Sequence, residues 1–224
     1  MKDQTKQNIR SNWFTKFPIG SDAPGERHFR DAVEENGPIA DGWKVEDVLY
    51  KFNNWCYRGQ LVPMPEFNAA FGCSCTFGTG VNQPWPEQLG VVNCGQPGAS
   101  NDKIARLAIA YCNTFNPQKI YVMWTFAQRR EWINEKGYVL AYKNQTIDNT
   151  KEWLYSHATL MNDVWDEYNY DKNQLLLRSY CKLNNIELAE THVTELPKIN
   201  YAPARDNTHP GPDWHLNVTA NFLT

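Results

Sequence analysis

The sequence lacks several features that define specialised classes of protein. No stretch approaches the roughly 20 consecutive apolar residues that a membrane-spanning helix needs. No charge of one sign dominates, since the formal net charge is −3 and the pI is near 6.0, so no electrostatic surface for nucleic acid is expected. None of the six cysteines forms a Cys-x-x-Cys pair. We therefore expect no membrane segment, metal, cofactor or nucleic-acid partner.

The N-terminus and the cysteines indicate a reducing compartment. Residues 1–8 (MKDQTKQN) lack the apolar core of a signal peptide, so we expect the protein to stay in the cytoplasm. The cysteines are then expected to be free and mostly buried thiols. With 224 residues, 42% of them apolar, the chain can form one well-buried α/β domain, and two full domains would be cramped.

The pattern of the chain changes at about residue 67. Glycines and prolines interrupt residues 1–66, yet the apolar anchors in this part predict an extension packed on the main domain. The main domain, residues 67–224, is predicted to alternate strands with helices. Strands are predicted at 67–73, 91–94, 119–124 and 186–191. Helices are predicted at 85–89, from Ser100, from Thr150 to 165, from Asp171 to 183, and at 212–223.

Alternation of this kind predicts a parallel sheet with helices on both faces. The unbroken apolar run at 119–124 (KIYVMW) suits a strand that is covered on both sides. The alternating run at 186–191 suits an edge strand. In such sheets, ligands bind beyond the carboxyl ends of the strands. We therefore expect Ser74, Gly98, Thr125 and the His209 loop, which all follow predicted strands, to meet at one edge.

Two short runs carry groups suited to nucleophilic catalysis. Gly72–Gly78 (GCSCTFG) places Ser74 between small residues in a tight turn, so its hydroxyl can stand free. Asp206–Gly211 (DNTHPG) places a carboxylate three residues before the imidazole of His209. A serine hydroxyl needs a base, and the base needs a third group to fix its tautomer. Alternatively, Asp206 only caps its own turn and His209 is a surface residue.

Three runs together resemble the SGNH hydrolases, the GDSL lipase/esterase superfamily. Gly72–Gly78 is similar to the first block of that family, Asn93–Ser100 (NCGQPGAS) to the second, and Asp206–Gly211 to the last, Asp-x-x-His-Pro. The resemblance covers about residues 67–224. It implies a flavodoxin-like three-layer α/β/α fold and the hydrolysis of acyl esters.

The resemblance also implies the roles of single residues. Ser74 would be the nucleophile, His209 the general base and Asp206 its carboxylate partner. The backbone N–H groups of Ser74 and Gly98 would bind the oxyanion. A glycine such as Gly98 can also be a simple turn residue. A thiol of Cys73 or Cys75 is a less favoured nucleophile.

Two positions depart from the family pattern. Cys73 stands where the first block carries an aspartate, which is not a member of the triad. The third block, Gly-x-Asn-Asp, has no counterpart after 119–124, so Thr125, Gln128 or Arg129 would have to supply the oxyanion donor of the missing asparagine. Losing one such donor typically costs on the order of 10²–10³ in rate.

The family resemblance favours a serine esterase that removes small acyl groups, such as acetyl, from a carbohydrate or a similar small polar ester. The nine tryptophans and eleven tyrosines agree with a sugar-binding surface. The missing donor keeps a weak or inactive glycan-binding or structural protein as an alternative, and an acyltransferase is another. Some related short chains are encoded by bacteriophages, so a viral origin also stays open.

Overall fold

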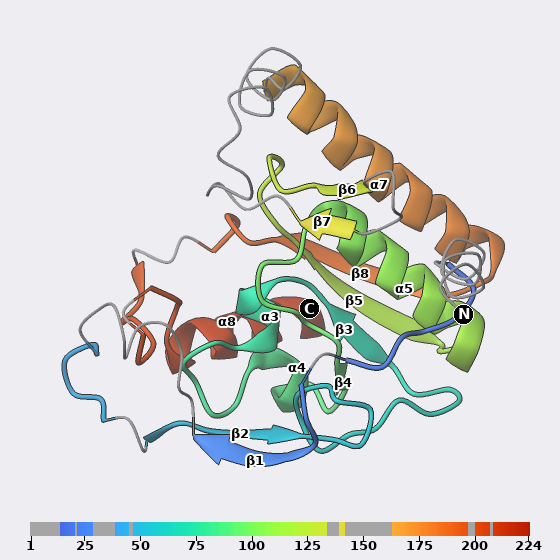
Figure 1. The fold of residues 1–224 in the computed structure, drawn as a ribbon. Helices are drawn as coiled ribbons and strands as arrows, with labels where there is room; N and C mark the ends of the chain where they lie inside the picture. The colour runs from blue at the N-terminus through green and yellow to red at the C-terminus, as the bar shows by residue number, and fades with distance from the viewer. Residues whose placement is uncertain are drawn as a thin grey trace.

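The computed structural model describes residues 14–20, 22–28, 39–44, 47–133, 139–141, 163–196, 200–206 and 208–224. Within these ranges, a parallel β-sheet lies between two layers of helices (Figure 1). None of the helices in these ranges combines the length and the apolar character that a bilayer crossing requires.

Four parallel strands form the central sheet, in the order β4-β3-β5-β8. They are β3 (Ala69–Phe71), β4 (Val92–Asn93), β5 (Lys119–Trp124) and β8 (Glu187–His192). The register pairs Ala70 with Asn93 on one side and with Tyr121 on the other. β4, which follows β3 along the chain, therefore lies at the edge of the sheet beside β3, and β5 lies on the other side of β3. This is the strand order of flavodoxin-like folds. The predicted α/β class is confirmed, as is the edge position of the last strand.

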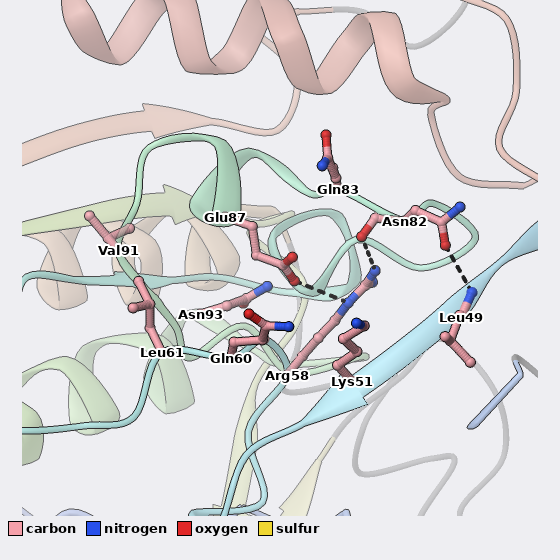
Figure 2. A pocket seen from close by; sticks show the side chains of 11 residues that line it. Leu49, Lys51, Arg58, Gln60, Leu61, Asn82, Gln83, Glu87, Val91 and Asn93 are labelled. Carbon is pink, nitrogen blue, oxygen red and sulfur yellow. Dashed lines mark hydrogen bonds and ion pairs between the residues drawn. The ribbon is translucent and has the colours of Figure 1, made fainter. Parts of the chain in front are cut away.

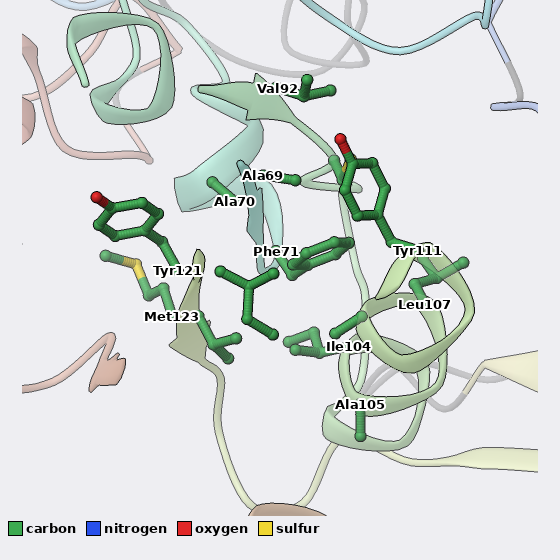
Figure 3. Close-up of a cluster of buried hydrophobic side chains, with 14 of the residues drawn as sticks. Ala69, Ala70, Phe71, Val92, Ile104, Ala105, Leu107, Tyr111, Tyr121 and Met123 are labelled. Atoms are coloured by element: carbon green, nitrogen blue, oxygen red, sulfur yellow. The ribbon is translucent and has the colours of Figure 1, made fainter. Parts of the chain in front are cut away.

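Helices cover both faces of this sheet (Figure 1). α5 (Asn101–Phe115) and α7 (Asp163–Leu183) pack together on one face, and α4 (Trp85–Gln88) and α8 (Pro212–Leu223) pack together on the other. Phe71, Ile104 and Tyr111 fill the space between β3 and α5 (Figure 3). Successive residues of a strand point to opposite faces of a sheet. Tyr121 of β5 points to the face that α8 covers, and its ring centroid lies 5.4 Å from that of Phe222.

Several predicted elements have the predicted ends. β5 spans the predicted residues, and α8 begins at Pro212, as the sequence indicates. Ser100 caps α5, because its hydroxyl accepts a hydrogen bond from the Lys103 N–H at 3.2 Å. β6 (Glu131–Ile133) and β7 (Val139–Ala141) form a small antiparallel pair that the sequence patterns do not predict.

The part of the chain before residue 67 contains strands that were not predicted. β1 (Gly25–His28) and β2 (Leu49–Phe52) form a two-stranded antiparallel sheet. Tyr50 of β2 is buried, and its hydroxyl accepts a hydrogen bond from the Gly80 N–H at 2.7 Å. Phe17 is also buried and stacks on Tyr57 at a centroid distance of 5.1 Å. The domain boundary at residue 67 stays a prediction.

α7 is one helix, so the predicted helix start at Asp171 is wrong. Three leucines of this helix are exposed: Leu175, Leu176 and Leu183. The buried face instead carries Asn169, Asn173, Leu177 and Cys181. Asp102 of α5 explains this orientation, because its carboxylate accepts hydrogen bonds from the Asn169 and Asn173 amides at 3.2 and 3.1 Å. Residues 150–162 of the predicted preceding helix lie outside the described residues.

Candidate active site

Ser74 lies where β3 leads into the short helix α3 (Ser74–Phe77), at the carboxyl end of the sheet (Figure 1). The Cys73 carbonyl accepts from the Phe77 N–H at 2.9 Å, and the Ser74 carbonyl accepts from the Gly78 N–H at 2.8 Å. Among the described residues, neither the Ser74 N–H nor its hydroxyl has a hydrogen-bond partner. Both groups are therefore open to a ligand, although the residue is only 8% exposed.

Two glycines bring neighbouring segments into direct contact with this turn. A Cβ on Gly72 would lie 2.0 Å from the Thr76 Oγ1 and 2.9 Å from the Met123 carbonyl oxygen. A Cβ on Gly95, in the loop after β4, would lie 2.4 Å from the Phe77 nitrogen. These separations are far below van der Waals contact, so a side chain fits at neither position without displacing its neighbours. The loop after β4 and the end of β5 are thus held against the Ser74 turn.

Asp206 and His209 form a hydrogen-bonded pair at the start of the loop that leads into α8. One oxygen of the Asp206 carboxylate accepts from the backbone N–H groups of Thr208 and His209 at 3.2 and 3.0 Å. The other oxygen is hydrogen-bonded to the His209 Nδ1. The Asp206 side chain is 2% exposed and that of His209 is 19% exposed. Asp206 therefore both caps its turn and orients the ring, whose Nε2 has no hydrogen-bond partner among the described residues.

The carboxylate of Asp206 is stabilised in its charged form. Burial alone would raise the pKa of Asp206, but the hydrogen bonds from the His209 side chain, the charge of its imidazolium form and the two backbone N–H groups outweigh burial. The pKa of Asp206 consequently lies below its ordinary value.

This direction predicts how stability depends on pH. A carboxyl group whose pKa is lower in the folded state adds stability above its unfolded pKa and loses it as the pH falls through the folded pKa. We expect Asp206→Asn to be less stable than wild type by roughly 1.5–3 kcal/mol at neutral pH, with the difference shrinking in acid. Urea unfolding at several pH values measures this, and a difference that stays constant down to about pH 2 would contradict it.

Gly80 connects this pair with the segment that carries Ser74. The Gly80 carbonyl accepts a hydrogen bond from the Arg205 N–H at 3.3 Å. A Cβ on Gly80 would lie 3.3 Å from the Asp206 Oδ1, so the carboxylate packs against the loop that directly follows α3. No hydrogen bond joins the Ser74 hydroxyl to His209 within the described part of the chain. Catalytic hydrogen bonds are often long without substrate and tighten only in its complex.

Thr125, Arg129 and Cys73 form a polar cluster beside the Ser74 turn. The Arg129 guanidinium donates to the Thr125 hydroxyl at 3.1 Å. A hydrogen bond with the Cys75 side chain lowers the pKa of the buried Cys73 thiol, and this effect, with further contributions from the Cys75 N–H, Thr125 and Arg129, outweighs the opposing effect of burial. Gln128 is partly exposed and has no side-chain hydrogen bond among the described residues. Two of the three donors proposed to replace the missing asparagine are thus linked to each other.

Asn101 is a site residue that the sequence analysis missed. Its side chain is fully buried and accepts from the Thr125 N–H at 3.0 Å, while its amide donates to the Thr125 and Phe126 carbonyls at 3.1 and 3.2 Å. Asn101 therefore fixes the backbone at the end of β5, and its amide is already occupied. Its place directly after the helix cap Ser100 is the only sequence signal, and that signal is weak.

Gly98 lies in the loop after β4, with a positive φ of 73° that glycine adopts readily. This loop is attached to the Ser74 turn, because the Gln96 N–H donates to the Gly72 carbonyl at 3.0 Å. The described hydrogen bonds include none between Gly98 and Ser74. The assignment of Gly98 as an oxyanion donor stays a prediction.

His215 and the cysteines lie mostly in the packed interior. His215 is buried in α8, and its Nδ1 accepts from the Trp85 N–H at 3.3 Å, so it joins α8 to α4. All six cysteines are free, with Cys56 half-buried and the others buried. No group of three or more His, Cys, Asp or Glu side chains in the described residues could hold a metal ion.

Comparison with known proteins finds no matching family model and no matching curated protein. Among solved structures, a catalytic variant of an acetylxylan esterase from Geobacillus stearothermophilus is 14% identical, with a TM-score of 0.34 over 71% of this chain and 94% of the other. An α/β hydrolase from the metagenome of Lake Arreo is 15% identical, with a TM-score of 0.35 over 74% and 96%. Similarity at this level supports no conclusion about activity, so any functional argument has to come from the residues of this chain.

Proposed function

We propose that the chain is a serine ester hydrolase of the SGNH type, with Ser74 as nucleophile, His209 as general base and Asp206 as the group that orients the base. One observation supports this most strongly: the buried Asp206 carboxylate holds the His209 ring and packs against the loop that follows Ser74. Ser74 begins the helix that follows the parallel strand β3, and its hydroxyl has no hydrogen-bond partner among the described residues. Both features agree with a role as nucleophile.

The proposed reaction follows from these groups. The neutral His209 ring accepts the Ser74 hydroxyl proton at Nε2 while the Ser74 Oγ attacks the ester carbonyl carbon. Asp206 keeps the Nδ1 proton in place and stabilises the imidazolium that forms. The ring then returns the proton to the leaving alkoxide as the C–O bond breaks. Water, activated by the same ring, releases the acid from the acyl-serine.

Negative charge on the carbonyl oxygen needs donors that are already in place. The Ser74 N–H has no partner among the described residues and so supports this role. Gly98 and the linked pair Thr125 and Arg129 are proposed to provide the others. The low exposure of Ser74 favours small acyl groups such as acetyl over long chains.

A fluorophosphonate probe, which reacts covalently with activated serines, tests the proposal directly. We expect the native protein to gain the mass of one adduct on the peptide that contains Ser74, because His209 increases the nucleophilicity of the hydroxyl. Heat-unfolded protein should not react. Absence of labelling in the native protein would favour the alternative of an inactive glycan-binding or structural protein. If the native protein reacts with the probe, and enzyme that has not been treated with the probe transfers acetyl to added sugars faster than to water, an acyltransferase is indicated.

A further inference from the structure

A cavity of about 580 Å³ lies between β2, α4 and the start of β4 (Figure 2). None of the predicted site residues lines it. Its lining residues come from three separate segments of the chain: Leu49, Lys51, Arg58, Gly59, Gln60, Leu61, Asn82, Gln83, Glu87, Val91 and Asn93. This volume lies in the range of small-molecule sites, which are roughly 300–1,000 Å³.

Arg58 forms a rigid wall of this cavity. Its side chain is 1% exposed, and its guanidinium donates to the carbonyls of Phe77 at 2.8 Å and Asn82 at 3.3 Å, and also to those of Gly78 and Val81. These bonds fix the loop between α3 and α4. The Arg58 Nε lies 3.7 Å from the Glu87 Oε1, beyond hydrogen-bond distance, and is buried without a hydrogen-bond partner in the described structure.

Glu87 lines the cavity beside Arg58 and forms an ion pair with it (Figure 2). Burial raises the pKa of Glu87, and the nearby charges of Arg58 and Lys51 only partly oppose this effect. The described residues provide no hydrogen-bond donor to its carboxylate. A partly desolvated carboxylate without donors is stabilised by any ligand that brings hydroxyl groups to it.

The amide side chains of the cavity divide into two kinds. Asn82 is already occupied, since its oxygen accepts from the Leu49 N–H at 2.8 Å and its nitrogen donates to the Asp47 carbonyl at 2.6 Å. Gln60 and Gln83 form no side-chain hydrogen bonds among the described residues, and both line the cavity. The NH₂ group of each side chain can donate hydrogen bonds to a ligand, and its carbonyl oxygen can accept them.

We propose that this cavity binds a neutral sugar unit. Sugar hydroxyls both donate and accept, which matches a carboxylate acceptor and two free amides. The Lys51 ammonium pairs with the Glu26 Oε1 at 3.1 Å and has further N–H donors for a ligand. Leu61 and Val91 provide apolar surface for the C–H groups of the ring. A phosphate or carboxylate ligand fits less well, because it would approach the Glu87 carboxylate. The inference is independent of ester hydrolysis, because Ser74, Asp206 and His209 do not line this cavity.

Titration of the ¹⁵N-labelled protein with glucose, xylose, N-acetylglucosamine and their β-1,4-linked disaccharides, followed by amide chemical shifts, tests the proposal. We expect saturable shifts at Lys51, Gln60, Gln83 and Glu87, with a Kd in the millimolar range for at least one sugar. Gln83→Ala removes a free amide from an exposed position and should weaken binding roughly tenfold. Glu87→Ala should weaken it at least as much.

Glu167→Ala is the matched control, because Glu167 is an exposed carboxylate on α7, on the opposite face of the sheet. It should bind the same sugar with unchanged affinity. The proposal is overturned if none of these sugars gives saturable shifts up to about 50 mM. It is also overturned if Gln83→Ala and Glu87→Ala bind like wild type, or if inorganic phosphate binds more tightly than every sugar. The titration reads binding alone, so its outcome is separate from that of the fluorophosphonate experiment.

Discussion

Ser74→Ala is expected to lower kcat for p-nitrophenyl acetate by roughly 10⁴- to 10⁶-fold, because it removes the oxygen that is proposed to form the acyl-enzyme. The substitution deletes one oxygen at a residue whose hydroxyl has no hydrogen-bond partner among the described residues. The fold should therefore be unchanged, and thermal unfolding should show a midpoint close to that of wild type. Stopped assays at saturating substrate measure the loss.

The matched control for Ser74→Ala is Cys75→Ala, which removes the neighbouring thiol from the same short helix. Cys75 is buried, so this variant tests whether a thiol rather than the hydroxyl attacks the ester. We expect it to keep most of the wild-type kcat. Loss of activity in folded Cys75→Ala, together with full activity in Ser74→Ala, would refute Ser74 as the nucleophile.

Asp206→Asn should lower kcat by about 10⁴-fold while KM changes little. The amide oxygen of asparagine can still accept from the backbone N–H groups of Thr208 and His209, so the turn should be kept. Its nitrogen, however, donates toward the His209 Nδ1 and forces the proton onto Nε2, where it blocks acceptance of the serine proton. Steady-state kinetics of the purified variant give both constants.

Asp213→Asn is the control for this carboxylate, because Asp213 is exposed in the first turn of α8, only four residues beyond His209. Its activity should match that of wild type. If Asp206→Asn and Asp213→Asn were equally active, the orienting role of Asp206 would be wrong. A rise in KM alone in Asp206→Asn would place the carboxylate in substrate binding instead.

Features that depend on neighbouring residues could be predicted from the sequence. The strand at 119–124 has no charged residue after Lys119, and residues 120–124 are all buried in a parallel sheet. Asp206 and His209 are three residues apart, so a single turn brings their side chains together. Ser100 caps α5 through a hydrogen bond to the third residue after it.

Features that depend on distant residues could not be predicted. Asn101 fixes the end of β5 across 24 positions, and no local pattern distinguishes it from an ordinary polar residue at a helix start. The orientation of α7 follows from hydrogen bonds to Asp102, about 70 positions away, and it leaves three leucines of the helix exposed. The strand β2 is short and gains its packing from Phe77, whose ring lies 5.4 Å from that of Tyr50.

The close contact of Gly72 and Gly95 with Thr76 and Phe77 limits how this protein can be re-engineered. A library that randomises the segment around Ser74 will lose most of its members if either glycine is included, because even alanine collides with backbone or β-carbon atoms there. Gln128 is a better position to randomise, because it is partly exposed and its side chain forms no hydrogen bond in the described structure. Substrate preference would then be changed at positions beside the Ser74 turn, while Gly72 and Gly95 are left as glycine.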